Sequence, residues 1–370
     1  MSAVAQLSSE FYLEKTTFAP GEPVFLYLKL SNNGPDTVEI VKPDPEQPFC
    51  SGVSITVSKD PANPSTCPIW ADNSCSIDGQ PPPLSPLLPG KSRIDRYLLN
   101  FSHEISSAGD YWVEAEDVDF AGRGAGEVHA KLYFRVDGDV PALPSNVQPW
   151  VDQLKSTDQE KRLEAARTLA SLAPPSVEGL LLTFADNPEF RSYAPLAFHR
   201  LHSARSMKAL ADLMKASGPG TFEQMEAARY LAESDDLQWY PLLLGAAQKN
   251  PRISEYPAYA AELGGVKMLP VLVDLAKSPE SRLQAVMAMG STGSRAAIPV
   301  LVELLKSPDE GTRDRASYSL HLLTHRTVDQ DPQNHDGQAE YIKWSQWWTS
   351  EGATAPIFKD TECGEPVPLP

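Results

Sequence analysis

The most constraining feature of this 370-residue sequence is a line that it repeats. LPVLVDLAKSPESRLQAVMAM begins at Leu269 and IPVLVELLKSPDEGTRDRASYSL begins at Ile298, so the pattern returns after 29 residues. Followed upstream, the register has steps of 30, 29, 33, 29 and 29 residues, and its six positions are Pro149, Gly179, Lys208, Pro241, Pro270 and Pro299. A recurrence every ~20–50 residues indicates stacked structural units.

Each unit has the pattern of two short helices. An apolar stretch is followed by a polar turn and then by a second segment, in which EAARTLA at 164–170 recurs as EAARYLA at 226–232. Apolar residues three and four apart, such as Leu163, Ala166 and Leu169, form one buried stripe. Isolated helices of fewer than about 12–15 residues are marginal in water, so these pairs must stack on one another.

The N-terminal part has a different period. Val24, Leu26, Leu28 and Leu30 alternate with more polar or aromatic residues after the turn at Pro20-Gly21. Similar short segments follow up to residue 136, separated by Gly, Pro and Asn. About seven short strands of this kind predict a two-layer β-sandwich.

Two resemblances extend this prediction. The segments APGEPVFLYLKLSNN, LLPGKSRIDRYLLNF and SAGDYWVEAE resemble the immunoglobulin-like domains that precede other modules in bacterial surface and periplasmic proteins. The unit AIPVLVELLKSPDEGTRDRASYSL resembles a HEAT repeat of the short bacterial type, which also occurs in phycobilisome lyases. The resemblances imply an immunoglobulin-like β-sandwich at 1–142, an α-solenoid of about six HEAT-like repeats at 146–327, and a capping tail at 328–370.

The charge distribution argues against nucleic acid as a partner. The chain has 32 basic and 49 acidic residues, a formal charge of −17. Residues 1–145 hold 10 basic and 20 acidic side chains, 146–327 hold 20 and 21, and 328–370 hold 2 and 8. Nucleic-acid binding requires clustered cations, which this distribution lacks. The sequence contains no uninterrupted apolar run of about 18 residues, so it predicts no membrane-spanning helix.

The HEAT resemblance directs attention to the second helices, which line the concave face in that family, usually a protein-binding surface. The candidates for such a groove are Tyr193, Arg229, Tyr230, Tyr256, Tyr259, Arg282, Arg313 and Tyr318. Tyrosine supplies contact area at little cost in entropy, but such rings also fill cores. Arginine recurs at the starts of second helices as Arg162, Arg191, Arg282 and Arg313. These arginines either contact a ligand or pair with an acid of a neighbouring unit, such as Asp158 or Asp309.

The tail contains aromatic residues three and four apart on a predicted short helix. They are Tyr341, Trp344, Trp347 and Trp348. The last unit of a solenoid exposes an apolar face, so a capping helix is one interpretation. A stacking platform for sugars or peptides is the other.

The sequence offers few metal ligands and no catalytic constellation. His321 and His325 lie one helical turn apart, followed by His335 and Asp336, so a transition-metal site is geometrically possible, although no glutamate is placed as a general base. The carboxylates of Glu114, Glu116, Asp117 and Asp119 either bind calcium or form a solvated strand and turn. We therefore predict no cofactor.

The cysteines bear on the compartment. The four are Cys50, Cys67, Cys75 and Cys363. An even number in loops fits disulfides, for example Cys67 with Cys75, with Cys50 then bonded to Cys363 or free; zinc fits less well without a C-x-x-C pair. The small residues Ala3 to Ala5 resemble the end of a signal peptide whose earlier parts are missing, or match by chance.

Together these patterns predict a non-enzymatic scaffold that binds a protein or peptide in the concave groove of its solenoid. They favour a periplasmic or secreted location over a cytoplasmic one. The alternative is a metal-dependent or lyase-type enzyme built on the same repeats, using the groove or the region of His321 and His325.

Overall fold

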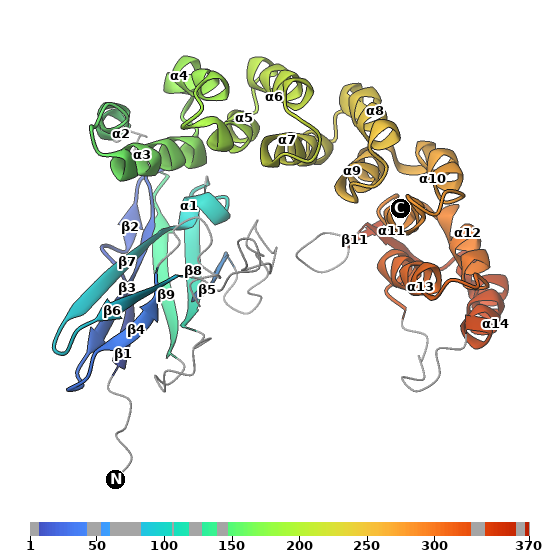
Figure 1. Cartoon of the computed structure of the whole chain (residues 1–370), viewed down its shortest axis with the longest axis horizontal. Coiled ribbons are helices and arrows are strands. Elements are labelled where there is room, and N and C mark those ends of the chain that lie inside the picture. Colours follow the sequence, from blue (N-terminus) through green and yellow to red (C-terminus); the bar gives the residue numbers. More distant parts are fainter. Residues whose placement is uncertain are drawn as a thin grey trace, which may run out of the picture. The chain divides into compact units, whose positions relative to one another are not determined.

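The structure is a computed structural model that describes residues 7–42, 53–59, 83–105, 107–117, 128–138, 147–326, 337–359 and 367–369. The chain divides into two compact units, Met1–Glu178 and Gly179–Pro370. The N-terminal region is rich in strands and the C-terminal region is helical (Figure 1). None of the helices in these ranges is long and apolar enough to cross a bilayer.

The first unit contains two main sheets. One has the antiparallel order β1 (Leu7–Leu13), β3 (Phe25–Asn32), β7 (Ser92–Leu98). The other has the order β2 (Thr17–Phe18), β9 (Val128–Val136), β8 (Gly109–Asp117), β5 (Val53–Ser58), in which only the β2–β9 pairing is parallel. A small antiparallel pair is made by β4 (Val38–Val41) and β6 (Leu84–Leu87).

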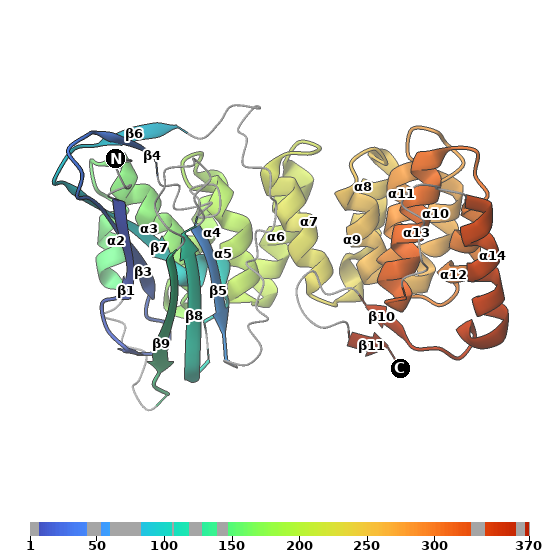
Figure 2. The same ribbon diagram turned by 90° about the horizontal axis from the view of Figure 1, so that it is seen from below.

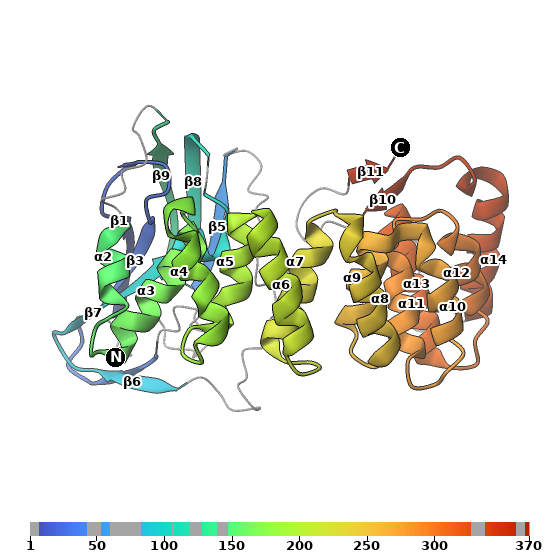
Figure 3. The ribbon, with the colours of Figure 1, turned by 90° about the horizontal axis from the view of Figure 1, so that it is seen from above.

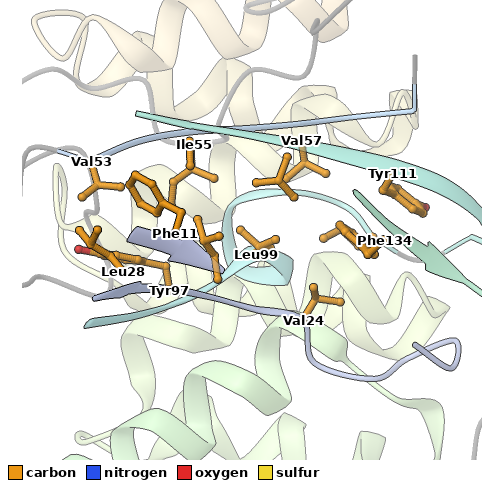
Figure 4. Packing of buried hydrophobic residues seen from close by; sticks show 14 of the residues in the cluster. Phe11, Val24, Leu28, Val53, Ile55, Val57, Tyr97, Leu99, Tyr111 and Phe134 are labelled. Atoms are coloured by element: carbon orange, nitrogen blue, oxygen red, sulfur yellow. The ribbon is translucent and has the colours of Figure 1, made fainter. Parts of the chain in front are cut away.

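Both main sheets contribute side chains to one hydrophobic core. The alternation predicted for the first long strand is confirmed, because Leu26, Leu28 and Leu30 of β3 are all buried. From the other sheet, the Phe134 ring stacks on that of Tyr111, with centroids 5.1 Å apart. Residues of both sheets meet in this cluster (Figure 4). The period of two therefore places every second residue inside.

The first unit also contains a helix pair, α2 (Gln148–Gln153) and α3 (Gln159–Leu172), after the short α1 (Leu99–Ser102). The Trp150 ring lies 6.1 Å from that of Phe25 on β3, and Arg96 of β7 forms an ion pair with Glu164 of α3. The helix pair thus contacts the outer face of the three-stranded sheet. The domain boundaries predicted from the sequence, at residues 142–146 and 327–328, stay a prediction.

The second unit contains two series of helices. The first helices of the pairs are α4 (Glu178–Leu182), α6 (Ala204–Ala216), α8 (Tyr240–Lys249), α10 (Leu269–Leu275) and α12 (Ala297–Leu304). The second helices are α5 (Ala194–Leu201), α7 (Phe222–Glu233), α9 (Glu255–Gly264), α11 (Arg282–Gly290) and α13 (Glu310–Thr324). The second helices pack one on the next from α5 to α13, and the first helices lie beside them (Figure 2, Figure 3).

Local signals set where these helices begin. Proline stands in the first turn of α5, α8, α10 and α12, where its missing N–H costs nothing. The side chain of Asp158 accepts hydrogen bonds from the first turn of α3, and that of Asp309 accepts one from the Thr312 N–H at 2.9 Å. Ser203 and Ser206 form a reciprocal capping box on α6.

The C-terminal segment packs against the last helix pair. α14 (Gly337–Trp347) contacts α12, and the strand β10 (Ile357–Lys359) packs against α13. A π-helical turn (Trp348–Gly352) follows α14, and β10 pairs with β11 (Val367–Leu369). Arg295, in the loop before α12, donates to the Gly352 carbonyl at 2.7 Å. This contact joins the tail to the repeats.

Candidate functional site

The repeated arginines bind the turns of their own helix pairs. Arg162, Arg282 and Arg313 each donate to a carbonyl six residues upstream, those of Ser156, Ala276 and Ser307, at 2.8, 3.1 and 3.0 Å. These carbonyls follow the ends of the first helices, where backbone acceptors lack intrahelical partners. The recurrence of arginine therefore reflects a repeated turn.

Two departures from the arginine pattern are also explained by the turns. Gln224 stands in the third unit and donates to the carbonyls of Met214 (2.8 Å) and Ser217 (3.0 Å), as the arginines do elsewhere. Arg191 instead approaches the Ser217 hydroxyl, at 3.3 Å.

Asp309, considered above as a partner for arginine, caps α13. Hydrogen bonds from Thr312, and then the charges of Arg282 and Arg313, hold the pKa of its carboxyl below the ordinary value.

The candidate tyrosines divide between core and surface. Tyr193, Tyr230 and Tyr256 are buried. The Tyr256 hydroxyl donates to the Gln224 side chain and accepts from the Gly220 N–H at 2.9 Å, which joins α9 to α7. Tyr259 is half-buried, and Tyr318 is 49% exposed. Tyr318 is therefore the candidate tyrosine best placed to meet a partner.

Tyr318 is one of four apolar residues on the neighbouring helices α11 and α13 whose side chains keep some exposure to solvent. Leu283 of α11 is 36% exposed, while Met287 of α11 and Leu322 of α13 are half-buried. The Ser319 hydroxyl donates to the Val286 carbonyl at 3.0 Å, so the two helices approach closely here. We call Leu283, Met287, Tyr318 and Leu322 the α11/α13 stripe. Leu283, Met287 and Leu322 were not predicted from the sequence, although the spacing of four residues in each helix could have revealed them.

A charged cluster lies on α7, together with one residue of α5. Arg229 donates to Glu226 at 2.6 and 3.3 Å and to Glu233 at 2.6 Å, and its guanidinium carbon lies 4.1 Å from the Tyr230 ring centroid. The His199 ring stacks on Tyr230, with centroids 4.2 Å apart. We call these five residues the Arg229 cluster. Arg229, predicted as a groove residue, is buried and held by carboxylates of its own helix.

Burial keeps His199 of this cluster neutral. The histidine pKa is lowered from 6.5 to about 3, first by burial and then by the charges of Arg200, Arg229 and His202. The Glu233 carboxylate lies 3.9 Å from Nε2, which is too far for a hydrogen bond. Within the described ranges, neither His199 Nδ1 nor the Tyr230 hydroxyl has a hydrogen-bond partner.

His199 should make stability depend on pH. Because the folded pKa lies below the unfolded one, its contribution is complete above about pH 6.5 and is lost as the pH falls toward 3. The variant His199→Phe keeps a stacking ring but cannot titrate. Between about pH 7.5 and 5, we expect its unfolding free energy to fall by roughly 2 kcal/mol less than that of wild type. Urea unfolding of both proteins across this range measures the difference. Equal losses would contradict the lowered pKa of this half-buried histidine.

The metal candidates do not converge. The ring centroids of His321 and His325 lie 5.8 Å apart, but the His325 ring packs edge to face with that of Phe358, and His321 Nδ1 is 3.3 Å from the Arg326 carbonyl. His335 and Asp336 lie outside the described residues. In the part of the chain that the structure describes, no three His, Cys, Asp or Glu residues gather around a possible metal position.

The remaining predicted residues are the aromatic residues of the tail and the four cysteines. Trp344 and Trp347 are buried and meet edge to face at 5.4 Å, whereas Trp348 is half-buried. Tyr341 is half-buried, and the Lys306 amine lies 4.6 Å from its ring. The disulfide candidates Cys50, Cys67, Cys75 and Cys363 all lie outside the described residues, so their pairing stays a prediction.

Comparison with known proteins identifies part of the helical unit. Residues 266–330 match the family of HEAT repeats, and no curated protein matches the chain. Two similar solved structures are Salmonella alpha-2-macroglobulin as a point mutant (13% identity, TM-score 0.20) and after reaction with methylamine (10%, TM-score 0.19).

The alignments with the two Salmonella proteins cover 94% and 92% of this chain but only 26% and 27% of those proteins. This chain thus spans about a quarter of their length, and at these scores the likeness carries no argument about fold or function. The segment that matches the HEAT-repeat family contains both α11 and α13. The α11/α13 stripe therefore lies on HEAT repeats.

Proposed function

We propose that the protein is a non-enzymatic scaffold that binds a protein or peptide along the second helices of its helical unit. The observation that supports this most directly is the α11/α13 stripe on matched HEAT repeats. HEAT repeats commonly mediate protein interactions. A row of half-exposed apolar side chains with one tyrosine is also the composition expected at the centre of a protein interface.

The proposal extends the repeats beyond the matched segment. The same register runs from Pro149 to Pro299, and the second helices from α5 to α13 pack in sequence. We therefore propose about six HEAT-like units preceded by an immunoglobulin-like domain. The even number of cysteines supports a location outside the cytoplasm.

Site-specific crosslinking tests the binding face. A photoreactive amino acid in place of Tyr318 should capture a defined partner in the native host, because this ring is exposed within the stripe. The same group in place of Val266, which is 56% exposed just before α10, serves as the matched position. A partner captured only at 266 would contradict the proposal.

The purified partner then allows a quantitative prediction. Leu283→Ala and Tyr318→Ala should each weaken its affinity about tenfold or more, since truncated central contacts typically cost upwards of about 1 kcal/mol. Val266→Ala should leave the affinity unchanged. Titration calorimetry measures all three, and circular dichroism establishes that each variant is folded. Wild-type affinity in both stripe variants would move the binding site elsewhere.

A further inference from the structure

The outer faces of the two main sheets in the first unit differ. On the three-stranded sheet, Tyr12 stacks on Tyr27 at 5.1 Å, and Trp150 of the first helix pair lies beside Phe25. On the four-stranded sheet, Tyr133 is 42% exposed next to Trp112, and the charged side chains around them are exposed too. A cross-strand aromatic pair stabilises its sheet, and an exposed one also offers a surface on which a ligand can pack.

The strand register organises this exposed surface into pairs. The outward residues of β8 stand directly opposite those of β9, and the pairs are Asp110 with Arg135, Trp112 with Tyr133, Glu114 with Lys131, and Glu116 with His129. We call these eight residues the β8/β9 face. Its centre is the aromatic pair, whose centroids are 5.7 Å apart.

The polar groups of the β8/β9 face are arranged with opposite signs. Lys131 contacts Glu114 at 2.8 Å, and Arg135 lies 3.8 Å from Asp110. The Tyr133 hydroxyl donates to Asp110 at 2.7 Å, and His129 lies 3.2 Å from Glu116. The acids thus stand opposite basic residues, in contrast to the formal charge of −17 on the whole chain.

Strand β5 adds hydroxyl groups beside these pairs. Thr56 stands opposite Glu114 and Ser54 opposite Glu116, so both lie on the same side of the sheet as the β8/β9 face. The surface therefore combines two aromatic rings with carboxylates, an amine and hydroxyls within a few strand spacings. Hydroxyls both donate and accept, and carboxylates accept only, so a ligand rich in hydroxyl groups can form further hydrogen bonds with these already paired groups.

We propose that the β8/β9 face binds a neutral carbohydrate, with a sugar ring against Trp112 and Tyr133 and its hydroxyls on Asp110, Glu114 and Lys131. The apolar face of a sugar ring packs on an aromatic ring, while its edge needs hydrogen bonds, which matches this arrangement. The centre of a protein interface is depleted of Lys, Glu and Asp, and nucleic acid requires unpaired cations, so both fit less well. The carbohydrate site is independent of the proposed protein-binding stripe.

Binding of short neutral oligosaccharides of glucose, xylose, mannose and N-acetylglucosamine to the full chain tests the proposal. Wild type should bind at least one series, whereas Trp112→Leu and Tyr133→Leu should each weaken that binding about tenfold, as expected for a lost aromatic contact. Tyr133→Phe keeps the ring and should retain most of the affinity. Titration calorimetry supplies the constants.

The matched control lies on the other sheet. Tyr12→Leu removes one ring of the directly opposed pair Tyr12 and Tyr27, so it disturbs a strand pair of the same kind. This variant should bind the oligosaccharide as wild type does. The proposal is overturned if wild type binds none of the four series, if it binds only acidic polysaccharides, or if both leucine variants on β8 and β9 keep full affinity while folded.

Discussion

Trp344→Ala is expected to lower the unfolding free energy by about 3–5 kcal/mol, the usual cost of removing a large buried aromatic side chain. The Trp344 side chain is only 1% exposed, and its ring meets that of Trp347 edge to face. Its helix, α14, contacts α12 of the last pair. The truncation therefore leaves a cavity where the tail covers the end of the repeats.

The effect of Trp344→Ala should be local. Repeat units contact mainly their neighbours, so protection against amide hydrogen exchange should fall in α12, α13 and α14 while the strands keep theirs. Ile342→Ala, on the same helix at a position 44% exposed, should change stability by less than about 0.5 kcal/mol. Chemical denaturation and exchange measure both variants. A loss spread evenly over the chain, or none, would show that α14 does not cap the repeats.

The second large effect is expected for Glu226→Ala, which should cost about 3 kcal/mol. Glu226 receives two hydrogen bonds from the guanidinium of Arg229, and both side chains are buried on α7. Removing the carboxylate leaves a buried cation with less compensation, and breaking such a pair is far more costly than replacing it whole. Glu226→Leu combined with Arg229→Met should therefore recover much of the lost stability.

An exposed pair provides the control for Glu226→Ala. Glu303 on α12 and Lys306, just beyond the end of that helix, have the same spacing of three residues and also form an ion pair, but both are exposed to solvent. Glu303→Ala should leave the urea midpoint unchanged within error, because solvent screens such pairs. If Glu226→Ala is equally silent, the Arg229 cluster is solvated in solution and the burial argument is wrong.

The candidate site was less predictable from sequence than the fold. Tyr230 and Tyr318 both stand in second helices, yet Tyr230 is buried against His199 and Tyr318 is exposed. The rotation of each helix about its axis decides this difference, and that rotation is set by the neighbouring pair. The recurrence of arginine was visible, but its carbonyl partners were not, because the ends of the first helices are known only once the turns have formed.

The sequence by itself determined the change from a strand-rich N-terminal part to helix pairs and the period of those pairs, because the periods of two and 3.6 residues are local properties of the backbone. It did not reveal β1 or the strands of the tail. Only the tertiary structure decided which aromatic residues meet solvent. Trp112 with Tyr133 and Tyr12 with Tyr27 are equivalent cross-strand pairs in sequence terms, yet Tyr133 is exposed and Tyr27 is buried. Exposure depends on what distant segments pack against each sheet, and no local pattern of residues encodes that.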